Sequence, residues 1–571
     1  MQLLSVGCSF DLNVKEDVPG GRMLRVTSNP GAPVNGLHLC LKGRYGYEFI
    51  HDRKRLQRPM VRRYLLEGAP RPTTPGAWVE VGWDTALELA AEGLWSQRLA
   101  HGAGALGVIG SGKLLTEESY LVQKLARQVL GTDNIDVAAH LQHDNILDGM
   151  DELAGWPAMT HTFDALIEQA GAALTLGSQT TEQHPVFGVK LRQAALRGKL
   201  RLVAADQEFS NMMEYAAQSL VYRPGTEVAL LNGLMHLIVG WEAQSPRFNP
   251  SGLPGYLAFH AVLEHYPPRR AAEITGVPAE ALERAARLLV EHRPAALIWS
   301  VGVTRAGPAR PVVASLVNLQ LLLGGLGEGL GLAPLVGQNN LQGALDMGCR
   351  PGMLPGGQPL ENLYDRELFE QAWGAPLPAQ PGLNAAQMLA ALQRQELQAL
   401  YLIGEDLPLT PRLRSLLRRA GFVVVQQILP GEIECCADVL LPGAAFAEKT
   451  GVCTNAERRV QLVQQAIEPP GQARPDWVIT ASLARRIQSL SERSAAPAPY
   501  AGWDYRDTAQ ILAEIAALAP AYAGVSQERL ARGETLHWPV DDLQHPGTPV
   551  LPVRKLHFTP VGYTIPEPVG V

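Results

Sequence analysis

Six short apolar runs, each ending in small or polar residues, recur along this chain and constrain its fold more than any other feature. The runs lie at 106–113, 172–182, 200–207, 295–304, 399–406 and 422–427. Amphipathic helical patterns lie between or beside them, at 83–100, 117–130, 227–241, 278–292 and 410–420. Short buried strands that alternate with helices are typical of parallel sheets, so the sequence predicts an α/β fold.

The residues that close these runs indicate where a ligand would lie. They read "GS" at 110–111, "GSQTTE" at 177–182, "ADQ" at 205–207 and "GED" at 404–406. Ligands of parallel sheets bind beyond the carboxyl ends of the strands. Glycine lets the backbone approach a ligand closely, and hydroxyls and acids can bind ribose, phosphate or a base edge. One such run is typical of a simple turn, but their repetition favours a nucleotide-like ligand.

Composition excludes several classes of protein. Of 571 residues, 46% are hydrophobic and 18% charged, which indicates a globular chain with ample core. The net charge is −7 and no basic run occurs, so we expect no binding to nucleic acid. The apolar stretch 316–335 is broken by glycine and is too short for a membrane span. The first residues lack the pattern of a secretory signal, so we expect a cytoplasmic protein.

Several longer stretches are more specific. They are "PVNGLHLCLKGRYGYEFI" (33–50), "GSQTTEQHP" (177–185), "YRPGTEVALLNG" (222–233), "GQNNLQGALDMG" (337–348), "LPGAAFAEKTGVCTNAERRVQ" (441–461) and "PPGQARPDW" (469–477). Together they resemble the molybdopterin oxidoreductase family, and in particular the catalytic (alpha) subunit of formate dehydrogenases. The resemblance extends in order over nearly all of residues 5–570.

The resemblance implies a multi-domain α/β fold with two Rossmann-like parallel-sheet domains and a small N-terminal β-rich domain. It places an iron–sulfur-type domain at 1–60, with later segments around 450–475 and 500–550. The first dinucleotide-binding domain would comprise 61–137 and 338–450, and the second 138–337. Residues 551–571 would form a linker-like tail, where the capping β-barrel of the family is expected to be absent.

The resemblance also implies the cofactors. Family members hold molybdenum or tungsten between two molybdopterin guanine dinucleotides (bis-MGD), beside a [4Fe–4S] cluster that removes electrons. Lys42 matches a lysine that lies between the cluster and the pterin. The motif positions expected to bind the dinucleotides are Gly177, Thr180, Glu182, His184, Asp206, Pro224, Gly225, Thr226, Gln338, Asn340, Gly404, Glu405, Lys449, Asn455 and Arg458.

The segment "AAHLQHDNILDG" (138–149) departs from the family pattern at its most important position. His143 matches the family's histidine, which would handle the proton in catalysis. Gln142 stands where the family has a cysteine or selenocysteine that binds the metal. A neutral amide is a poor substitute for that soft anion. A zinc site at His140 and His143 is disfavoured, since no further cysteine or acid is suitably spaced.

Two further departures concern the substrate and the cluster. Val336 stands where formate dehydrogenases have an arginine that binds the formate carboxylate, and valine has no donor. Cys8 and Cys40 match the third and fourth cluster cysteines, whereas Met1 and Leu4 occupy the first two positions. Two thiolates do not suffice for a stable [4Fe–4S] cluster, so these cysteines are expected to be remnants.

Three hypotheses therefore remain open from the sequence. The chain is a formate dehydrogenase-like oxidoreductase that oxidises a small substrate, formate by resemblance. Alternatively, it is a catalytically inactive scaffold or regulatory subunit of a redox complex. The third possibility is a nucleotide- or pterin-binding carrier. The expected partners are an electron-transfer subunit or a separate capping domain.

Overall fold

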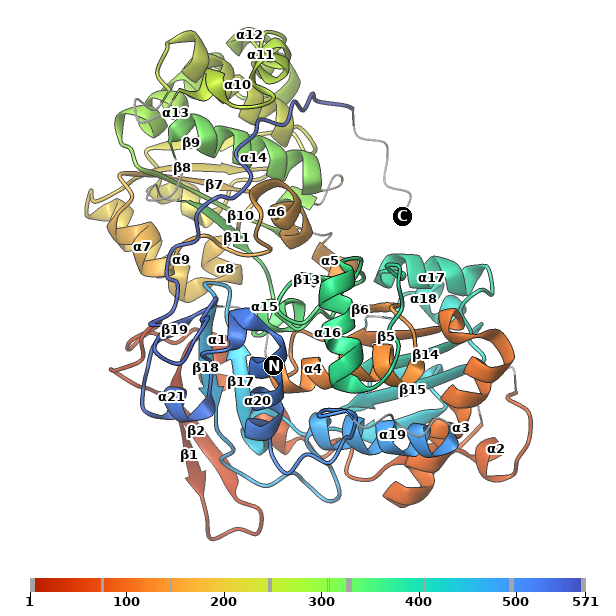
Figure 1. The fold of residues 1–571 in the computed structure, drawn as a ribbon. Coiled ribbons are helices and arrows are strands. Elements are labelled where there is room, and N and C mark those ends of the chain that lie inside the picture. Colours follow the sequence, from red (N-terminus) through yellow and green to blue (C-terminus); the bar gives the residue numbers. More distant parts are fainter. Residues whose placement is uncertain are drawn as a thin grey trace.

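The computed structural model describes residues 6–72, 76–143, 146–244, 249–304, 307, 309–324, 331–404, 407, 409–491 and 498–565, with only the backbone at 142 and 143. Met1, Leu4 and Glu405 lie outside the described residues. Two α/β units, each built on its own sheet, form most of the molecule (Figure 1). The chain starts the larger sheet, leaves it after residue 137 to build the smaller one, and returns at residue 399.

The smaller sheet has five strands, which are all parallel and run in the order β11-β10-β7-β8-β9. Its strands are β7 (Ala172–Leu176), β8 (Arg201–Asp206), β9 (Gln218–Val221), β10 (Ala295–Ser300) and β11 (Leu332–Leu335). Its helices are α6 (Ile146–Ala154), α7 (Phe163–Glu168), α8 (Thr180–Gln183), α9 (Pro185–Leu196), α10 (Glu227–Gly240), α11 (Tyr256–Leu263), α12 (Pro268–Thr275), α13 (Ala279–Glu291) and α14 (Ala309–Leu323).

The larger sheet has seven strands in the order β4-β3-β16-β15-β14-β5-β6. Five of them are parallel, and β3 and β4 add an antiparallel edge. The strands are β3 (Met60–Arg62), β4 (Trp78–Glu80), β5 (Leu106–Gly110), β6 (Ile135–Val137), β14 (Ala399–Ile403), β15 (Phe422–Gln427) and β16 (Val439–Pro442). The helices around it are α2 (Arg63–Leu66), α3 (Trp83–His101), α4 (Thr116–Lys124), α5 (His140–His143), α15 (Leu341–Asp346), α16 (Leu363–Trp373), α17 (Ala385–Gln393), α18 (Pro411–Leu417), α19 (Asp476–Leu490) and α20 (Thr508–Leu518).

Each parallel sheet is covered on both faces, which explains why its strands read as continuous apolar runs. In the seven-stranded sheet, Val424 faces the core of α3, α4 and α19, while its neighbours Val423 and Val425 face α17 and α18. In the five-stranded sheet, Leu297 faces α10, α13 and α14, and Ile298 faces α7 and α9. The predicted α/β fold with two parallel-sheet domains is thus confirmed.

A small β-rich region begins the described chain. It consists of the hairpin β1 (Phe10–Lys15) and β2 (Arg22–Ser28), followed by the short helix α1 (Leu41–Tyr45). A second small sheet joins β17 (Gly451–Thr454), β18 (Arg459–Val463) and β19 (Leu536–His537), and the helix α21 (Gln527–Ala531) packs beside it. The small N-terminal β domain expected from the sequence is therefore present.

After β19, the last described residues run from the three-stranded sheet to the five-stranded unit as an extended segment (Figure 1). The amide of Leu551 donates to the Thr160 carbonyl at 2.8 Å, and that of Arg554 to the Ala154 carbonyl at 2.9 Å. The ring of Phe558 stacks on Phe259 with centroids 4.6 Å apart. This segment, expected to be linker-like, thus lies against the second α/β unit. Within the described residues, no helix is both long and apolar enough to cross a membrane.

Candidate functional site

The turn after β7 draws the carboxyl ends of three strands together. Gly177 adopts a φ of +53°, and its amide donates to the Ala205 carbonyl of β8 at 2.9 Å. Its own carbonyl accepts from the amide of Gly302, just after β10, at 3.1 Å. A Cβ at Gly177 would come within 2.9 Å of the Val303 nitrogen, so this close approach requires glycine. The turn is therefore a tight junction at the edge where ligands of parallel sheets bind.

The helix α8 starts from this junction and ends at a buried histidine. Thr180 is buried at its first position, with its Oγ1 2.8 Å from the hydroxyl oxygen of Ser178. The Nε2 of His184 donates to the Val336 carbonyl at 3.1 Å, whereas the side chain of Glu182 is exposed. His184 is expected to bind the dinucleotide, and Val336 is expected to stand at the position of the formate-binding arginine. The hydrogen bond makes these two residues direct neighbours.

The end of β8 and the start of α10 lie beside the same edge. Asp206 is buried, and its Oδ1 accepts the amide of Gln207 at 2.8 Å. The Gln207 side chain, which the sequence analysis did not select, donates to Glu227 at 3.0 Å and to the Gly302 carbonyl at 3.3 Å. Burial raises the pKa of the Glu227 carboxyl. Gln207 therefore bridges the loops after β8 and β10 and the first turn of α10.

The turn 224–226 precedes α10. Pro224 is exposed, Gly225 has a φ of +80°, and Thr226 is buried with its hydroxyl donating to the Arg223 carbonyl at 2.6 Å. The hydrogen bond and the positive φ define a tight helix start. The structure thus places this predicted motif near Asp206, whose carbonyl accepts the Tyr222 amide at 3.0 Å.

Residues 336–340 connect this edge to the corresponding edge of the seven-stranded sheet. The side-chain oxygen of Gln338 accepts from the amide of Gly112 at 2.8 Å, in the loop after β5. The amide of Asn340 donates to the Gly112 carbonyl at 2.8 Å, and its side chain donates to the Leu114 carbonyl at 2.7 Å. Because His184 binds Val336 in the same segment, a short stretch of chain joins the ligand-binding edges of both sheets.

The end of β15 carries a residue that the sequence analysis missed. Gln427 is 4% exposed, and neither its side-chain nitrogen nor its oxygen has a partner within the part of the chain that the structure describes. It lies beside Gly404, whose φ is +72° and whose amide donates to the Gln426 carbonyl at 2.8 Å. A buried amide normally has partners, so Gln427 is a candidate ligand-binding residue. The sequence feature that could have identified Gln427 is its position at the end of the apolar run 422–427.

Lys449 lies in a fully buried ionic triad. Its ammonium nitrogen lies 2.6 Å from an oxygen of Glu118 and 2.6 Å from an oxygen of Asp476. Burial alone lowers the pKa of Lys449, but the two carboxylates outweigh it and raise that pKa. The triad fixes the start of β17 to α4 and α19, and a role of Lys449 toward a cofactor remains a prediction.

Asn455 and Arg458, in the turn between β17 and β18, are also buried. The side-chain amide of Asn455 donates to the Val6 carbonyl at 2.8 Å. Burial lowers the pKa of Arg458 to about 9. Its guanidinium donates to the carbonyls of Met159, Trp538, Thr548 and Pro549. These contacts connect the turn to the N-terminal region, the five-stranded unit and the segment after β19.

Cys8 and Cys40 line one cavity of about 520 Å³, together with Lys42, Asn339 and Cys453. Burial and the nearby Cys40 raise the pKa of Cys8 to about 12. Cys40 caps α1, with its sulfur accepting the Gly43 amide at 3.3 Å. In the described ranges, no group of three or more histidine, cysteine or acidic side chains is placed to hold a metal ion. These residues alone therefore do not complete a four-thiolate cluster site.

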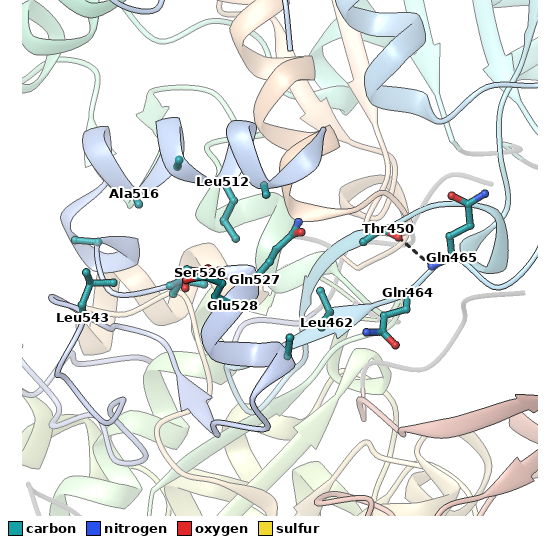
Figure 2. Close-up of a pocket in the computed structure, with 15 residues that line it drawn as sticks. Thr450, Leu462, Gln464, Gln465, Leu512, Ala516, Ser526, Gln527, Glu528 and Leu543 are labelled. Carbon is teal, nitrogen blue, oxygen red and sulfur yellow. Dashed lines mark hydrogen bonds between the residues drawn. The ribbon is translucent and has the colours of Figure 1, made fainter. Parts of the chain in front are cut away.

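A second cavity, of about 880 Å³, lies between α20, α21 and the β17–β18 hairpin (Figure 2). Its wall is mostly apolar and includes Leu512, Ala516 and Leu462. Gln527 in this wall donates to the buried Glu117 at 3.0 Å, and burial raises the pKa of Glu117 to about 8. Residues near the end of β18 line both cavities, namely Leu462, Gln464 and Gln465.

The segment 138–149 forms α5 and the start of α6 beyond the end of β6. His140 is buried and its Nδ1 lies 2.6 Å from Asp136. The side chains of Gln142 and His143 lie outside the described residues. The backbone nevertheless places both positions beyond the carboxyl end of a parallel strand, the edge where ligands of such sheets bind.

The loops after the strands of two sheets meet through one short segment, residues 336–340, which defines a two-unit α/β protein. Family comparison is more specific. The model described as molybdopterin oxidoreductase matches residues 55–486, and that of the molybdopterin oxidoreductase Fe4S4 domain matches residues 5–52. The chain belongs to the molybdopterin oxidoreductase family, as the sequence motifs indicated.

Individual proteins agree with this assignment. The F420-dependent formate dehydrogenase subunit alpha of Methanocaldococcus jannaschii is 33% identical over 551 residues, which are 96% of this chain and 76% of the relative. The probable oxidoreductase YjgC of Bacillus subtilis is 33% identical over 578 residues, 99% of this chain and 56% of the relative. Acetylene hydratase from Pelobacter acetylenicus has the same fold, with a TM-score of 0.71 at 17% identity, over 93% of this chain and 73% of that chain.

Family membership implies a molybdopterin cofactor with molybdenum or tungsten. The described residues fit the organic part of such a group. Gln427 offers a buried donor and acceptor at one sheet edge, and at the other edge Gly177 lets the loop after β10 approach the end of β7 closely. The cysteines fit the inorganic cluster less well, because the described residues include only two of its expected ligands.

Proposed function

We propose that this chain is the cofactor-binding subunit of a formate dehydrogenase-like oxidoreductase that acts on a small substrate. Bis-MGD, with molybdenum or tungsten, would lie across the carboxyl edges of the two parallel sheets. Two hydrogen bonds to residues 336–340 carry this proposal. His184 donates to the Val336 carbonyl, and the backbone amide of Gly112 donates to the side-chain oxygen of Gln338. They bring two separate ligand-binding edges to one segment, as a two-part dinucleotide cofactor requires.

We assign different roles in cofactor binding and catalysis to different residues of the chain. When bound, the cofactor would supply the redox chemistry that accepts the two electrons released on oxidation of the substrate. Gly177, Asp206 and Gln427 would hold its nucleotide parts at the sheet edges. His143, beside the metal position at Gln142, would accept the substrate's proton.

The substrate follows from the relatives only in part. Several relatives carry formate dehydrogenase in their names, which makes formate the first substrate to test. Val336 offers no side-chain donor to a carboxylate, and it is 3% exposed. Its carbonyl is also taken up by His184. We therefore propose a small oxidisable substrate whose binding does not depend on a cation at position 336.

Two analyses of the purified full chain test this function. Metal analysis and guanine nucleotide release after acid treatment should give molybdenum or tungsten together with the nucleotide in fixed proportion to protein. Nucleotide without metal would instead identify the carrier function. Absence of both after expression with a functional cofactor supply would contradict the proposal.

A second function is favoured by two features. Gln142 stands at the position expected for the metal-binding anion, and only two of the cysteines expected to bind the cluster, Cys8 and Cys40, line the cavity within the described residues. These features suit an inactive scaffold or regulatory subunit that keeps the fold and binds an electron-transfer subunit or a separate capping domain. A stable partner recovered after gentle purification, with neither metal nor nucleotide bound, would support this function. The cytoplasmic location remains a prediction from the sequence.

A further inference from the structure

Two adjacent cysteines far from the sites described above place their sulfur atoms in contact. The Sγ atoms of Cys435 and Cys436 lie 3.5 Å apart. Cys435 ends a short 3-10 helix (Glu432–Cys435), and Cys436 caps it. Cys436 is buried, whereas Cys435 is partly exposed. The pair therefore has one open side toward solvent.

The surrounding hydrogen bonds hold this turn in place. Arg71 donates to the Cys436 carbonyl at 2.9 Å, and Arg62 donates to the Glu434 carbonyl at 2.6 Å. The thiol of Cys436 donates to the Arg414 carbonyl at 3.7 Å. These bonds anchor the backbone at Glu434 and Cys436 and the sulfur of Cys436. The two sulfur atoms therefore lie next to one another before any ligand binds. Such preorganisation lowers the entropic cost of binding a ligand through both.

Burial raises the pKa of the Cys436 thiol to about 12, and the neighbouring Cys435 adds to the shift. At neutral pH the Cys436 sulfur therefore stays protonated, and an isolated thiolate here is disfavoured. A ligand that replaces the thiol protons without leaving net charge avoids this cost. The site thus suits a neutral, sulfur-seeking group with low coordination number.

We propose that Cys435 and Cys436 form a binding site for trivalent arsenicals. Each thiol condenses with one As–OH group, so that an S–As bond forms, an As–O bond breaks and water leaves. Two condensations give a cyclic, uncharged dithio-arsenic(III) product with no change in oxidation state. The third arsenic substituent would point to the open side at Cys435. Soft sulfur ligands suit this element, whereas zinc requires four ligands.

Phenylarsine oxide, applied to the reduced full chain, is the probe that tests this site. Peptide mapping by mass spectrometry should find one phenylarsenic group on the peptide that carries both cysteines. The adduct should survive excess 2-mercaptoethanol and disappear with dithiothreitol, because only a dithiol competes with a chelate. The variant Cys435→Ser should lose this resistance, with retention after the monothiol wash falling at least tenfold.

Matched variants separate this pair from the other cysteines. Cys8→Ser removes one thiol of the other cysteine-lined cavity and should leave the Cys435–Cys436 adduct intact. A thermal shift on adding the probe should be present in Cys8→Ser and absent in Cys435→Ser. If Cys435→Ser does not fold, prior alkylation of the partly exposed Cys435 in the native chain should block the adduct equally. An adduct at this pair that the monothiol removes, or one that persists in Cys435→Ser, would overturn the proposal.

Discussion

The Nδ1 atom of His140 lies 2.6 Å from the Oδ1 atom of Asp136, and both side chains are almost fully buried. Asp136 also accepts the backbone amides of Val137 at 2.8 Å and Ala385 at 2.7 Å. Burial alone lowers the pKa of His140, but the carboxylate outweighs it and raises that pKa. The first histidine of the segment 138–149 is thus paired with an acid of its own chain.

This pair makes stability depend on pH. Because the folded-state pKa of His140 lies above its usual value of about 6.5, the stabilisation is full below that pH and is lost as pH rises through the folded pKa. His140→Gln should lower the free energy of unfolding by about 3 kcal/mol in mild acid. Urea unfolding of both proteins at several pH values checks this. If the difference in unfolding free energy between the two proteins stays constant into the alkaline range, the prediction is contradicted.

Asp346 should also make the free energy of unfolding fall as pH rises, but in a lower pH range than His140. It is fully buried, accepts hydrogen bonds from Tyr522 at 2.7 Å and Gln342 at 2.8 Å, and burial raises its pKa to about 7. Between about pH 4 and 7 the folded chain keeps a proton that the unfolded chain releases, so stability falls by about 4 kcal/mol as pH rises. Asp346→Asn should remove this part of the pH dependence. Equal pH profiles for the two proteins would show that Asp346 titrates normally.

The contribution of the buried Lys449 ion pairs to stability can be compared with that of a more exposed ion pair. Lys449→Met leaves Glu118 and Asp476 buried without their cation and should cost about 3–5 kcal/mol of unfolding free energy. Lys190→Met is the control, because Lys190 pairs with Asp164 at 2.8 Å in a more exposed setting. That change should cost about 1 kcal/mol or less. Chemical denaturation at neutral pH measures both, and similar losses would refute the argument.

Gln427 and Gln426 form a matched pair for the cofactor site. Gln427→Leu removes an amide that has no described partner, so the stability of the cofactor-free chain should stay equal or rise by about 1–3 kcal/mol. The amount of guanine nucleotide retained should nevertheless fall. Gln426→Leu removes hydrogen bonds with Asp476 and Tyr401 and should lower stability. Retention of full nucleotide by a folded Gln427→Leu chain would exclude Gln427 from the site.

Iron content tests the cysteine cavity. The described cavity contains three thiols, those of Cys8, Cys40 and Cys453, which is fewer than the four that a cubane cluster needs, so the purified chain should hold well under four iron atoms per molecule. Anaerobic purification followed by iron and acid-labile sulfide analysis measures this. A full complement of four, with the absorption of a cubane cluster, would mean that further ligands reach this cavity.

The sequence predicted the long buried strands well because their apolar runs of five or six residues end in glycine or polar residues. The strands β3 and β4 were missed, since three residues are too few to show a period. The sequence also could not show which of the neighbouring residues Gln426 and Gln427 has hydrogen-bond partners inside the fold. Only the tertiary contact with Tyr401 shows which of the two neighbouring amides is already satisfied. Likewise, Lys449 is placed by Glu118, 331 positions away in the chain.

Helix α4 shows a similar limit. The sequence predicts one helix over 117–130, but the structure ends α4 at Lys124 and continues it as a π-helix, Leu125–Leu130. In that wider turn Arg127 donates to Asp133 at 2.7 Å and to the Gly348 carbonyl at 2.9 Å. Amphipathic spacing does not reveal such a local widening of a helix.

The extended segment after β19 has a mechanical consequence for the space between the two sheets. It is anchored at one end near β19 and at the other by Phe558, which stacks on Phe259, and by Asn318, whose side chain donates to the Thr559 carbonyl at 2.7 Å. A rotation that spreads the two α/β units would have to stretch this strap or pull Phe558 out of its stack. This segment therefore limits how far the two α/β units can separate while its contacts at Phe558 and Thr559 persist.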